Sequence, residues 1–406
     1  MKKYNITFIL LCLAFCVKGQ VKALISAHID TVYSQSLKEN RPVWIYSPDY
    51  DTTYFTKPQY PVLYLLDGDG YFASLVTMVQ QLSSINGNTV LPEMIIVGVP
   101  NLPGKRNRDL TPSTTDLLAG SGGGEAFTSF LEKDLIPYVD AHYATAPHRT
   151  LVGHSLGGLM AINTLLKHSS VFSAYAALDP SMSYDREKLL KQVNVLLSAK
   201  HLSGKTLFLG IANTMNPEMD TVQVKSDTSG ITNHIRSIFK LKDFLTSAPD
   251  THLRWTYKYY ADDDHASMVL IATYDALRFI FKHNRFPRNQ PQNQYLDKAY
   301  SAAQLNALII NHYNELSSEM GYQVRPPEAL MNQMGYMFLQ QKNLDKAALF
   351  FKLNLRYYAE SFNAYDSMGD YYLATNNKDL AKKYFENALK LKSTAEIRNK
   401  LLELKK

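Results

Sequence analysis

The sequence predicts an α/β fold, in which helices cover both faces of a mostly parallel twisted sheet, followed by an all-α tail. Short apolar runs alternate with helix-like stretches from residue 20 to about residue 286. Several of these runs are continuously apolar or β-branched, as strands buried on both faces require. Beyond a polar stretch with two prolines, residues 284–293, only helical spacing remains.

The elements follow in order along the chain. Apolar runs predict strands at residues 41–47, 60–66, 93–99, 150–152, 174–178, 206–212 and 253–260. Between them, apolar residues at helical spacing predict helices at residues 125–142, 157–168, 234–245 and 267–283. We therefore expect a sheet domain over residues 20–286, a linker over residues 287–296 and a helical domain over residues 297–406.

The helical tail contains an internal repeat of 34 residues. The residues that coincide after this shift are Met334, Gly335, Phe338, Ala347 and Phe351 with Met368, Gly369, Tyr372, Ala381 and Phe385. A small residue lets two antiparallel helices cross closely while large ones fill the groove beside it. This spacing resembles the tetratricopeptide repeat. Two such units bury little, so helices near residues 297–318 and 394–405 should pack on them, and the tail could bind a protein partner.

Composition limits the function classes. The 406 residues are 46% hydrophobic and 20% charged, which suits a large globular core. Part of the formal charge of +6 lies in Lys2, Lys3 and Lys18. Because no basic run has interleaved aromatic residues, neither a nucleic acid nor a membrane surface is expected as a partner.

Residues 1–19 have the pattern of an export signal, with a basic start, a short apolar run and small residues before Gln20. The apolar run is too short for a transmembrane helix. We expect a periplasmic or secreted protein rather than a lipoprotein, because large Phe15 precedes Cys16. Cys12 and Cys16 are the two cysteines of the chain, so the mature protein should have neither a disulfide nor a cysteine metal site. No metal or cofactor is expected.

The chemistry centres on Gly153-His154-Ser155-Leu156-Gly157, a G-x-S-x-G pattern between a strand and an apolar helix. In that context the serine stands on a sharp strand-to-helix turn, which exposes its hydroxyl at the edge of the sheet. Ser155 is therefore the candidate nucleophile. The alternative is a tight turn of small residues without catalytic function.

A serine nucleophile needs a base and an acid that orients the base. His265 lies just past the carboxyl end of strand 253–260, where such a base must stand. For the acid, the order serine, acid, histidine favours the loop after strand 206–212, and we choose Asp220. The alternatives are Glu218 and Asp227 in that loop and Asp179 after strand 174–178.

An oxyanion hole requires two backbone N–H donors. Leu156, directly after the nucleophile, should supply one. Asp69 should supply the other from the loop Asp67-Gly68-Asp69-Gly70, which follows an inner strand. Substrate contacts are expected from Arg106, Arg108 and His154.

These motifs together resemble a known family. YLLDGDG (64–70), IIVGVPN (95–101), RNRDLTP (106–112), VGHSLGG (152–158) and DDDHAS (262–267) are similar to the esterase D and ferric enterobactin esterase-like branch of the α/β-hydrolases. The resemblance covers about residues 21–286 and implies the same roles for Ser155, His265, Asp69 and Leu156. Where ferric enterobactin esterases carry a glutamate after Gly-Ile, this chain has Ala212, so its acid is displaced or replaced.

The expected function is an exported serine ester hydrolase that forms an acyl-enzyme on Ser155 and acts on a siderophore-like or acylated carbohydrate ester. Acyl transfer by the same nucleophile is one alternative, because both reactions share the first half-reaction. A receptor without catalysis, which recruits a partner through its helical repeats, is the other.

Overall fold

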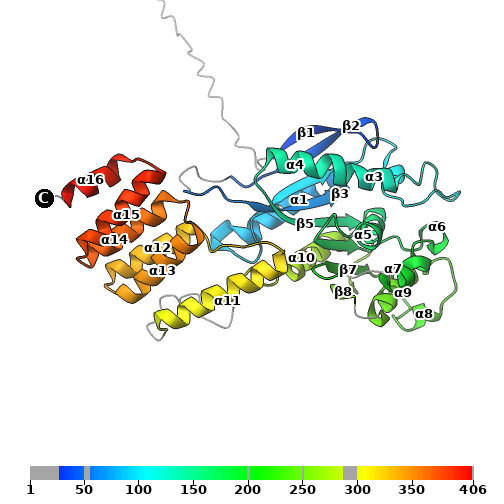
Figure 1. The fold of residues 1–406 in the computed structure, drawn as a ribbon. Coiled ribbons are helices and arrows are strands. Elements are labelled where there is room, and N and C mark those ends of the chain that lie inside the picture. Colours follow the sequence, from blue (N-terminus) through cyan, green and yellow to red (C-terminus); the bar gives the residue numbers. More distant parts are fainter. Residues whose placement is uncertain (1–26, 50–54, 199–201, 249–250, 287–299, 405–406) are drawn as a thin grey trace, which may run out of the picture.

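The computed structural model describes residues 27–49, 55–198, 202–248, 251–286 and 300–404 (Figure 1). The predicted signal peptide, both cysteines and the predicted linker 287–296 lie outside the described residues.

An eight-stranded sheet in the order β1-β2-β4-β3-β5-β6-β7-β8 forms the centre of the molecule. The strands from β4 to β8 in this order pair in parallel, while β2 pairs antiparallel with both β4 and β1 at one edge. The strands are β1 Ala27–Ser34, β2 Glu39–Tyr46, β3 Tyr60–Leu66, β4 Ile95–Val99, β5 Thr145–His154, β6 Ala174–Leu178, β7 Thr206–Ala212 and β8 Arg254–Tyr260. The predicted α/β architecture with a mostly parallel sheet is confirmed.

The predicted strand bounds fit best where a strand is buried on both faces. Every residue of β3, β6 and β7 is buried, and their bounds are those expected. Strand β1 was not predicted, because most of its side chains face solvent at the sheet edge and give no apolar run. Strand β5 begins five residues before the predicted one, at Thr145, since its polar first half shows no strand pattern.

Helices cover both faces of the sheet, and each face has its own apolar core. The first core is formed by helices α3 Gly124–Phe130, α4 Ile136–His142, α5 Leu156–Lys167, α7 Val193–Ser198 and α9 Asn233–Ser247, with a π-helical turn Leu131–Leu135 between α3 and α4. Helices α1 Gly68–Ser83, α10 Met268–Ile280 and α11 Ala302–Met320 form the second. Short helical segments complete the domain: η1 Ile85–Gly87, α2 Arg106–Asp109, α6 Tyr184–Glu187, η3 Leu190–Gln192 and α8 Gln223–Ser226.

Helix α11 belongs to two cores. Its carboxyl end packs Leu316 and Met320 among the side chains of the second sheet core, and the Met320 carbonyl oxygen lies 3.3 Å from His148 Nδ1. Its middle packs Ile309 into the core of the tail. Figure 1 shows this helix, in yellow, running from the sheet domain to the tail. The predicted boundary at residue 297 assigns α11 to the tail, although α11 also completes the second core of the sheet domain.

The tail beyond α11 consists of two helical hairpins and a last helix, namely α12 Glu328–Gln340 with α13 Leu344–Tyr357, α14 Phe362–Ala374 with α15 Lys378–Leu391, and α16 Ala395–Glu403. The 34-residue shift relates the two hairpins in space. A Cβ atom on Gly335 would lie 2.4 Å from the ring of Phe351, and one on Gly369 would lie 2.4 Å from the ring of Phe385. These glycines are needed for the close crossing of paired helices, as the sequence predicted.

In the part of the chain that the structure describes, no helix combines the length and the apolar character that crossing a membrane requires.

Candidate active site

Ser155 stands on a strained turn between β5 and α5. Its backbone adopts φ 58° and ψ −115°, a conformation that a residue with a side chain rarely takes. The turn needs small neighbours, because a Cβ atom on Gly153 would lie 2.2 Å from the Gly157 carbonyl oxygen. The Ser155 N–H donates to the Leu178 carbonyl, 3.0 Å away, which ties the turn to the end of β6. The sequence therefore builds the predicted sharp turn.

The Ser155 hydroxyl is partly exposed and lies 3.2 Å from the hydroxyl of Ser181. Ser181 was not predicted as a site residue. Its backbone N–H donates to the Ser155 carbonyl, 3.0 Å away, so the loop after β6 packs directly on the nucleophile turn. The Ser155 hydroxyl therefore pairs with Ser181, and to act as a nucleophile it must exchange this partner for a base; catalytic hydrogen bonds often tighten only when substrate binds.

His265 is paired with Asp179. Its Nδ1 lies 2.5 Å from Asp179 Oδ2, and its side chain is 40% exposed. His265 lies in the loop between β8 and α10, and Asp179 directly follows β6, so both side chains come from the carboxyl ends of parallel strands. A carboxylate in this position fixes the imidazole tautomer that leaves Nε2 free to accept a proton.

Asp179 is fully buried. The Ala212 N–H donates to its Oδ1 at 2.9 Å, and Nε2 of His234 lies 2.8 Å from its Oδ2. Burial opposes ionisation, but the hydrogen bonds from His234 and His265 outweigh it and hold the pKa of Asp179 below its usual range. The backbone of Ala212, at the end of β7, thus serves the acid that follows the neighbouring strand β6.

The choice of Asp220 as the acid is therefore corrected. Asp220 is exposed, and its Oδ1 accepts the N–H groups of Val222 and Gln223, at 2.8 and 2.7 Å, around the start of α8. Asp227 accepts hydrogen bonds from Ser229 and Thr232 in the same loop, and Glu218 is exposed. These carboxylates organise their own loop or face solvent, and none bonds His265. Asp179 was the alternative kept from the neighbouring strand.

His154 holds the His265 loop. It is 8% exposed, and its Nε2–H donates to the His265 carbonyl oxygen at 2.7 Å. Burial lowers the pKa of His154 to about 4, so its ring is neutral at pH 7. The two rings lie with centroids 4.4 Å apart. His154 thus positions the His265 loop, and its contact with substrate stays a prediction.

The two expected oxyanion donors stand at the starts of two helices that follow neighbouring strands. The residues concerned, Leu156 and Asp69, are the first residue of α5 and the second of α1, where backbone N–H groups have no acceptor within the helix. Strands β5 and β3, which precede them, pair in parallel. The segment with Asp69 is the first helical turn of α1 and not a loop, because Asp67 takes a left-handed conformation with φ 53° and turns the chain into the helix.

The two arginines have different surroundings. Arg106 donates from Nε and Nη2 to the carboxylate of Asp67, at 2.6 and 2.9 Å, and its side chain is 37% exposed. Asp67 directly precedes α1, so Arg106 braces the turn that carries Asp69. Arg108 is instead engaged by Glu39 and Asp109, at 2.5 and 2.7 Å. The expected substrate role of Arg108 is corrected to a structural one, because its donors already serve these carboxylates.

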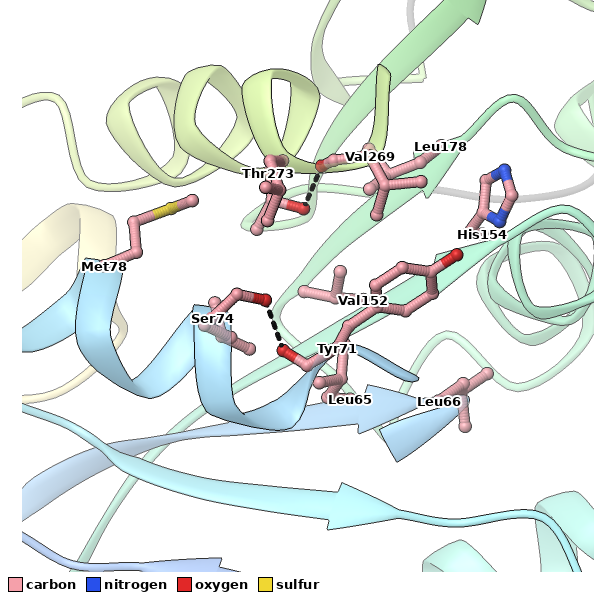
Figure 2. Close-up of a pocket in the computed structure, with 12 residues that line it drawn as sticks. Leu65, Leu66, Tyr71, Ser74, Met78, Val152, His154, Leu178, Val269 and Thr273 are labelled. Atoms are coloured by element: carbon pink, nitrogen blue, oxygen red, sulfur yellow. Dashed lines mark hydrogen bonds between the residues drawn. The ribbon is translucent and has the colours of Figure 1, made fainter. Parts of the chain in front are cut away.

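An apolar pocket lies beside His154, between α1 and α10 (Figure 2). Figure 2 shows the side chains of Tyr71 and His154 together at one end of it, and their rings meet edge to face. The remaining lining is largely aliphatic, with Leu65, Leu66, Leu75, Met78, Val152, Leu178, Val269 and Leu270. Tyr71 and His154 are both close in sequence to the expected oxyanion donors, so the pocket adjoins the reaction centre.

The fold and this site define an α/β-hydrolase. The model of the family described as "Putative esterase" matches residues 34–232. Among solved structures, an IroE-like serine hydrolase from Shewanella oneidensis is 30% identical with a TM-score of 0.66, over 82% of this chain and 99% of that one. The chain belongs to this esterase family and is a hydrolase that acts on esters.

Two curated relatives share part of this chain. Ferri-bacillibactin esterase BesA of Bacillus subtilis is 25% identical over 236 residues, which cover 54% of this chain and 78% of BesA. Apo-salmochelin esterase of Escherichia coli is 33% identical over 163 residues, which cover 36% of this chain and 50% of that protein. This chain thus spans most of the first relative and half of the second.

Proposed function

We propose that this protein is an exported serine esterase that hydrolyses siderophore esters through an acyl-enzyme on Ser155. The proposal is carried by the hydrogen bond between His265 and Asp179 at the sheet edge where the strained turn presents Ser155. Two relatives of the chain are named for the siderophore esters they cleave, which supports this class of substrate. The export signal expected at residues 1–19 accords with a substrate met outside the cytoplasm.

The reaction proceeds in two half-reactions. The Ser155 hydroxyl rotates from Ser181 toward His265, gives its proton to Nε2 and attacks the ester carbonyl carbon. The N–H groups of Leu156 and Asp69 stabilise the oxyanion, each by roughly 3 kcal/mol as judged from oxyanion-hole mutants. The tetrahedral intermediate then collapses, the carbon–oxygen bond to the alcohol breaks, and His265 returns the proton to the leaving alcohol.

Water completes the cycle. His265 removes a proton from a water molecule, the hydroxide oxygen attacks the acyl carbon, and collapse releases the acid and restores the Ser155 hydroxyl. Asp179 keeps Nδ1 of His265 protonated throughout and stabilises the imidazolium. His154 holds the His265 loop through the His265 carbonyl, and Arg106 braces the oxyanion turn through Asp67.

The test uses the mature chain and its Ser155→Ala variant. We expect the parent to hydrolyse short-chain aryl esters and to be labelled by a fluorophosphonate, and the variant to do neither. Ser181→Ala is the matched control, because it removes the neighbouring hydroxyl and should leave labelling intact. Labelling of neither parent nor control would contradict a serine mechanism and leave a receptor without catalysis as the better explanation.

The substrate class is tested separately on the same proteins. Catecholate siderophore esters, feruloylated and acetylated carbohydrate esters should be compared by kcat/KM, and we expect the siderophore esters to be hydrolysed fastest. A carbohydrate ester as the best substrate would overturn that assignment while leaving the serine mechanism in place. Transfer of the acyl group to an added sugar, faster than hydrolysis, would identify an acyltransferase.

A further inference from the structure

Three metal-ligating atoms converge behind the candidate base. Asp179 Oδ2, a ring nitrogen of His234 and a ring nitrogen of His265 all lie within 4.8 Å of one another. They come from three separate elements, namely the loop after β6, the first turn of α9 and the loop after β8. His234 is not needed for a serine triad, and it nevertheless directs Nε2 at the same carboxylate oxygen as His265, 2.8 Å away.

From this arrangement we propose that Asp179, His234 and His265 form a binding site for Zn²⁺, and that occupation of this site switches the esterase off. Two imidazole nitrogens and one carboxylate oxygen are a ligand set that zinc takes in proteins, with water as the fourth ligand. Binding rests on the geometry alone, whereas inhibition rests also on the proposed function.

The negative charge of the Asp179 carboxylate favours a divalent cation between the two imidazoles. Asp179 is fully buried, and the hydrogen-bond partners of its carboxylate among the described residues are His234, His265 and the Ala212 N–H. No lysine or arginine among these partners compensates its negative charge. The Ala212 N–H holds Oδ1, so Oδ2 remains directed between the two rings.

The two histidines of this cluster are partly exposed. The side chain of His234 is 25% exposed and that of His265 is 40% exposed, while Asp179 forms the buried floor. Coordination requires the 2.5 Å hydrogen bond between His265 Nδ1 and Asp179 Oδ2 to open. The imidazole ligands favour zinc and its neighbours in the first transition series, and they disfavour Mg²⁺ and Ca²⁺, which prefer oxygen ligands.

Coordination would reverse the tautomer of His265. The metal takes the lone pair of Nδ1, so the ring proton moves from Nδ1 to Nε2, and the charge of the neutral ring does not change. Nε2 is the atom that must accept the Ser155 proton, and once protonated it cannot do so. The same step withdraws Asp179 from its role toward His265. Zn²⁺ therefore acts as an inhibitor and not as a Lewis acid for the ester.

The binding test uses the full mature chain carrying Ser155→Ala, titrated calorimetrically with ZnCl₂ and, in parallel, with MgCl₂. We expect one Zn²⁺ site and no Mg²⁺ heat. Adding His234→Gln should weaken zinc binding by at least about tenfold, because it removes one of three ligands. His168→Gln is the matched control, since His168 is also paired with a carboxylate, Glu125 at 2.9 Å, and lies outside this cluster. It should leave this site unchanged.

Equal zinc affinity in the His234→Gln and His168→Gln proteins would overturn the proposal, as would the absence of a zinc heat in the parent. Should His234→Gln fail to fold, as judged by its thermal melt, His265→Gln in the same background replaces it, with the same expected loss. The inhibition test adds ZnCl₂ to the active parent, and chelation by EDTA should restore the rate. Zinc binding without inhibition would refute the switch while retaining the site.

Discussion

The Asp179→Asn substitution tests the candidate triad most directly. The amide can keep its oxygen toward the Ala212 N–H, which donates to Oδ1 in the parent at 2.9 Å. Its NH₂ group then stands where Oδ2 accepts from His265 and His234, at 2.5 and 2.8 Å. The new NH₂ group would then face the Nδ1–H group of His265, and two donors cannot bond each other. His265 must therefore carry its proton on Nε2, so that Nδ1 can accept.

The expected loss follows from that tautomer change. The same substitution in a serine protease triad lowers kcat by about 10⁴-fold, equivalent to about 5 kcal/mol of barrier. We expect a loss of that order here with little change in KM, because Asp179 is buried behind His265 and does not line the pocket of Figure 2. Initial rates of aryl-ester hydrolysis over a range of concentrations separate kcat from KM.

Asp220→Asn is the matched control. Asp220 is exposed and organises its own loop through backbone N–H groups, so this variant should keep kcat within about twofold of the parent. The reasoning is refuted if a folded Asp179→Asn protein retains more than about a tenth of the parent kcat, since the wrong tautomer should cost far more. It is equally refuted if Asp220→Asn loses as much activity as Asp179→Asn.

Three further predictions concern stability. Burial lowers the pKa of His148 from 6.5 to about 4, so the unfolded chain takes up a proton there first as the pH falls. As the pH falls from 6.5 to 4, the free energy of unfolding should therefore decrease by about 1.4 kcal/mol per pH unit. Urea melts of His148→Gln over the same range should show a smaller decrease. Gly369→Ala should cost about 1–3 kcal/mol of unfolding free energy, because its methyl group would collide with Phe385, and so should lower the melting temperature. Gly70→Ala, in open space on a helix, should not lower the melting temperature. A chain ending at residue 326 should retain aryl-ester activity and one ending at residue 292 should be markedly less stable, because α11 completes the second sheet core; equal melting temperatures would contradict this.

The sequence predicted strands β2 to β8 and missed the exposed edge strand β1. Strands β3, β6 and β7 are buried on both faces, so their apolar runs coincide with the strands themselves. Helix α1 was not predicted, and its first turn was interpreted as a loop because Gly68 and Gly70 are typical of turns. Gly68 is needed for another reason, since a Cβ atom there would lie 2.8 Å from the Val99 N atom of β4.

The candidate site was predicted where local pattern determines position. Ser155 is marked by its glycines and His265 by its place after a strand, and both follow from the chain itself. The acid depends on which loop folds back over the histidine, a long-range property that a single sequence does not encode locally. The useful signal was that Asp179 directly follows β6, which is buried throughout. An acid at that position lies at the carboxyl end of a central strand, where the nucleophile and the base also stand.

His234 shows the remaining difficulty. It lies in a helix whose start gave no sign of facing the sheet edge, and its contact with Asp179 spans 55 residues of chain. Its role could be recognised only once α9 was placed against the sheet.

Because α11 packs into two hydrophobic cores, it determines how the protein should unfold on heating. A tail joined by a loose tether would melt independently and give its own calorimetric peak. Here a single helix, α11, contributes Met320 to the second sheet core and Ile309 to the core of the tail. Unfolding of either core should therefore destabilise the other, and calorimetry should show one cooperative transition. A molecule that binds the helical hairpins should likewise raise the melting temperature of the sheet domain.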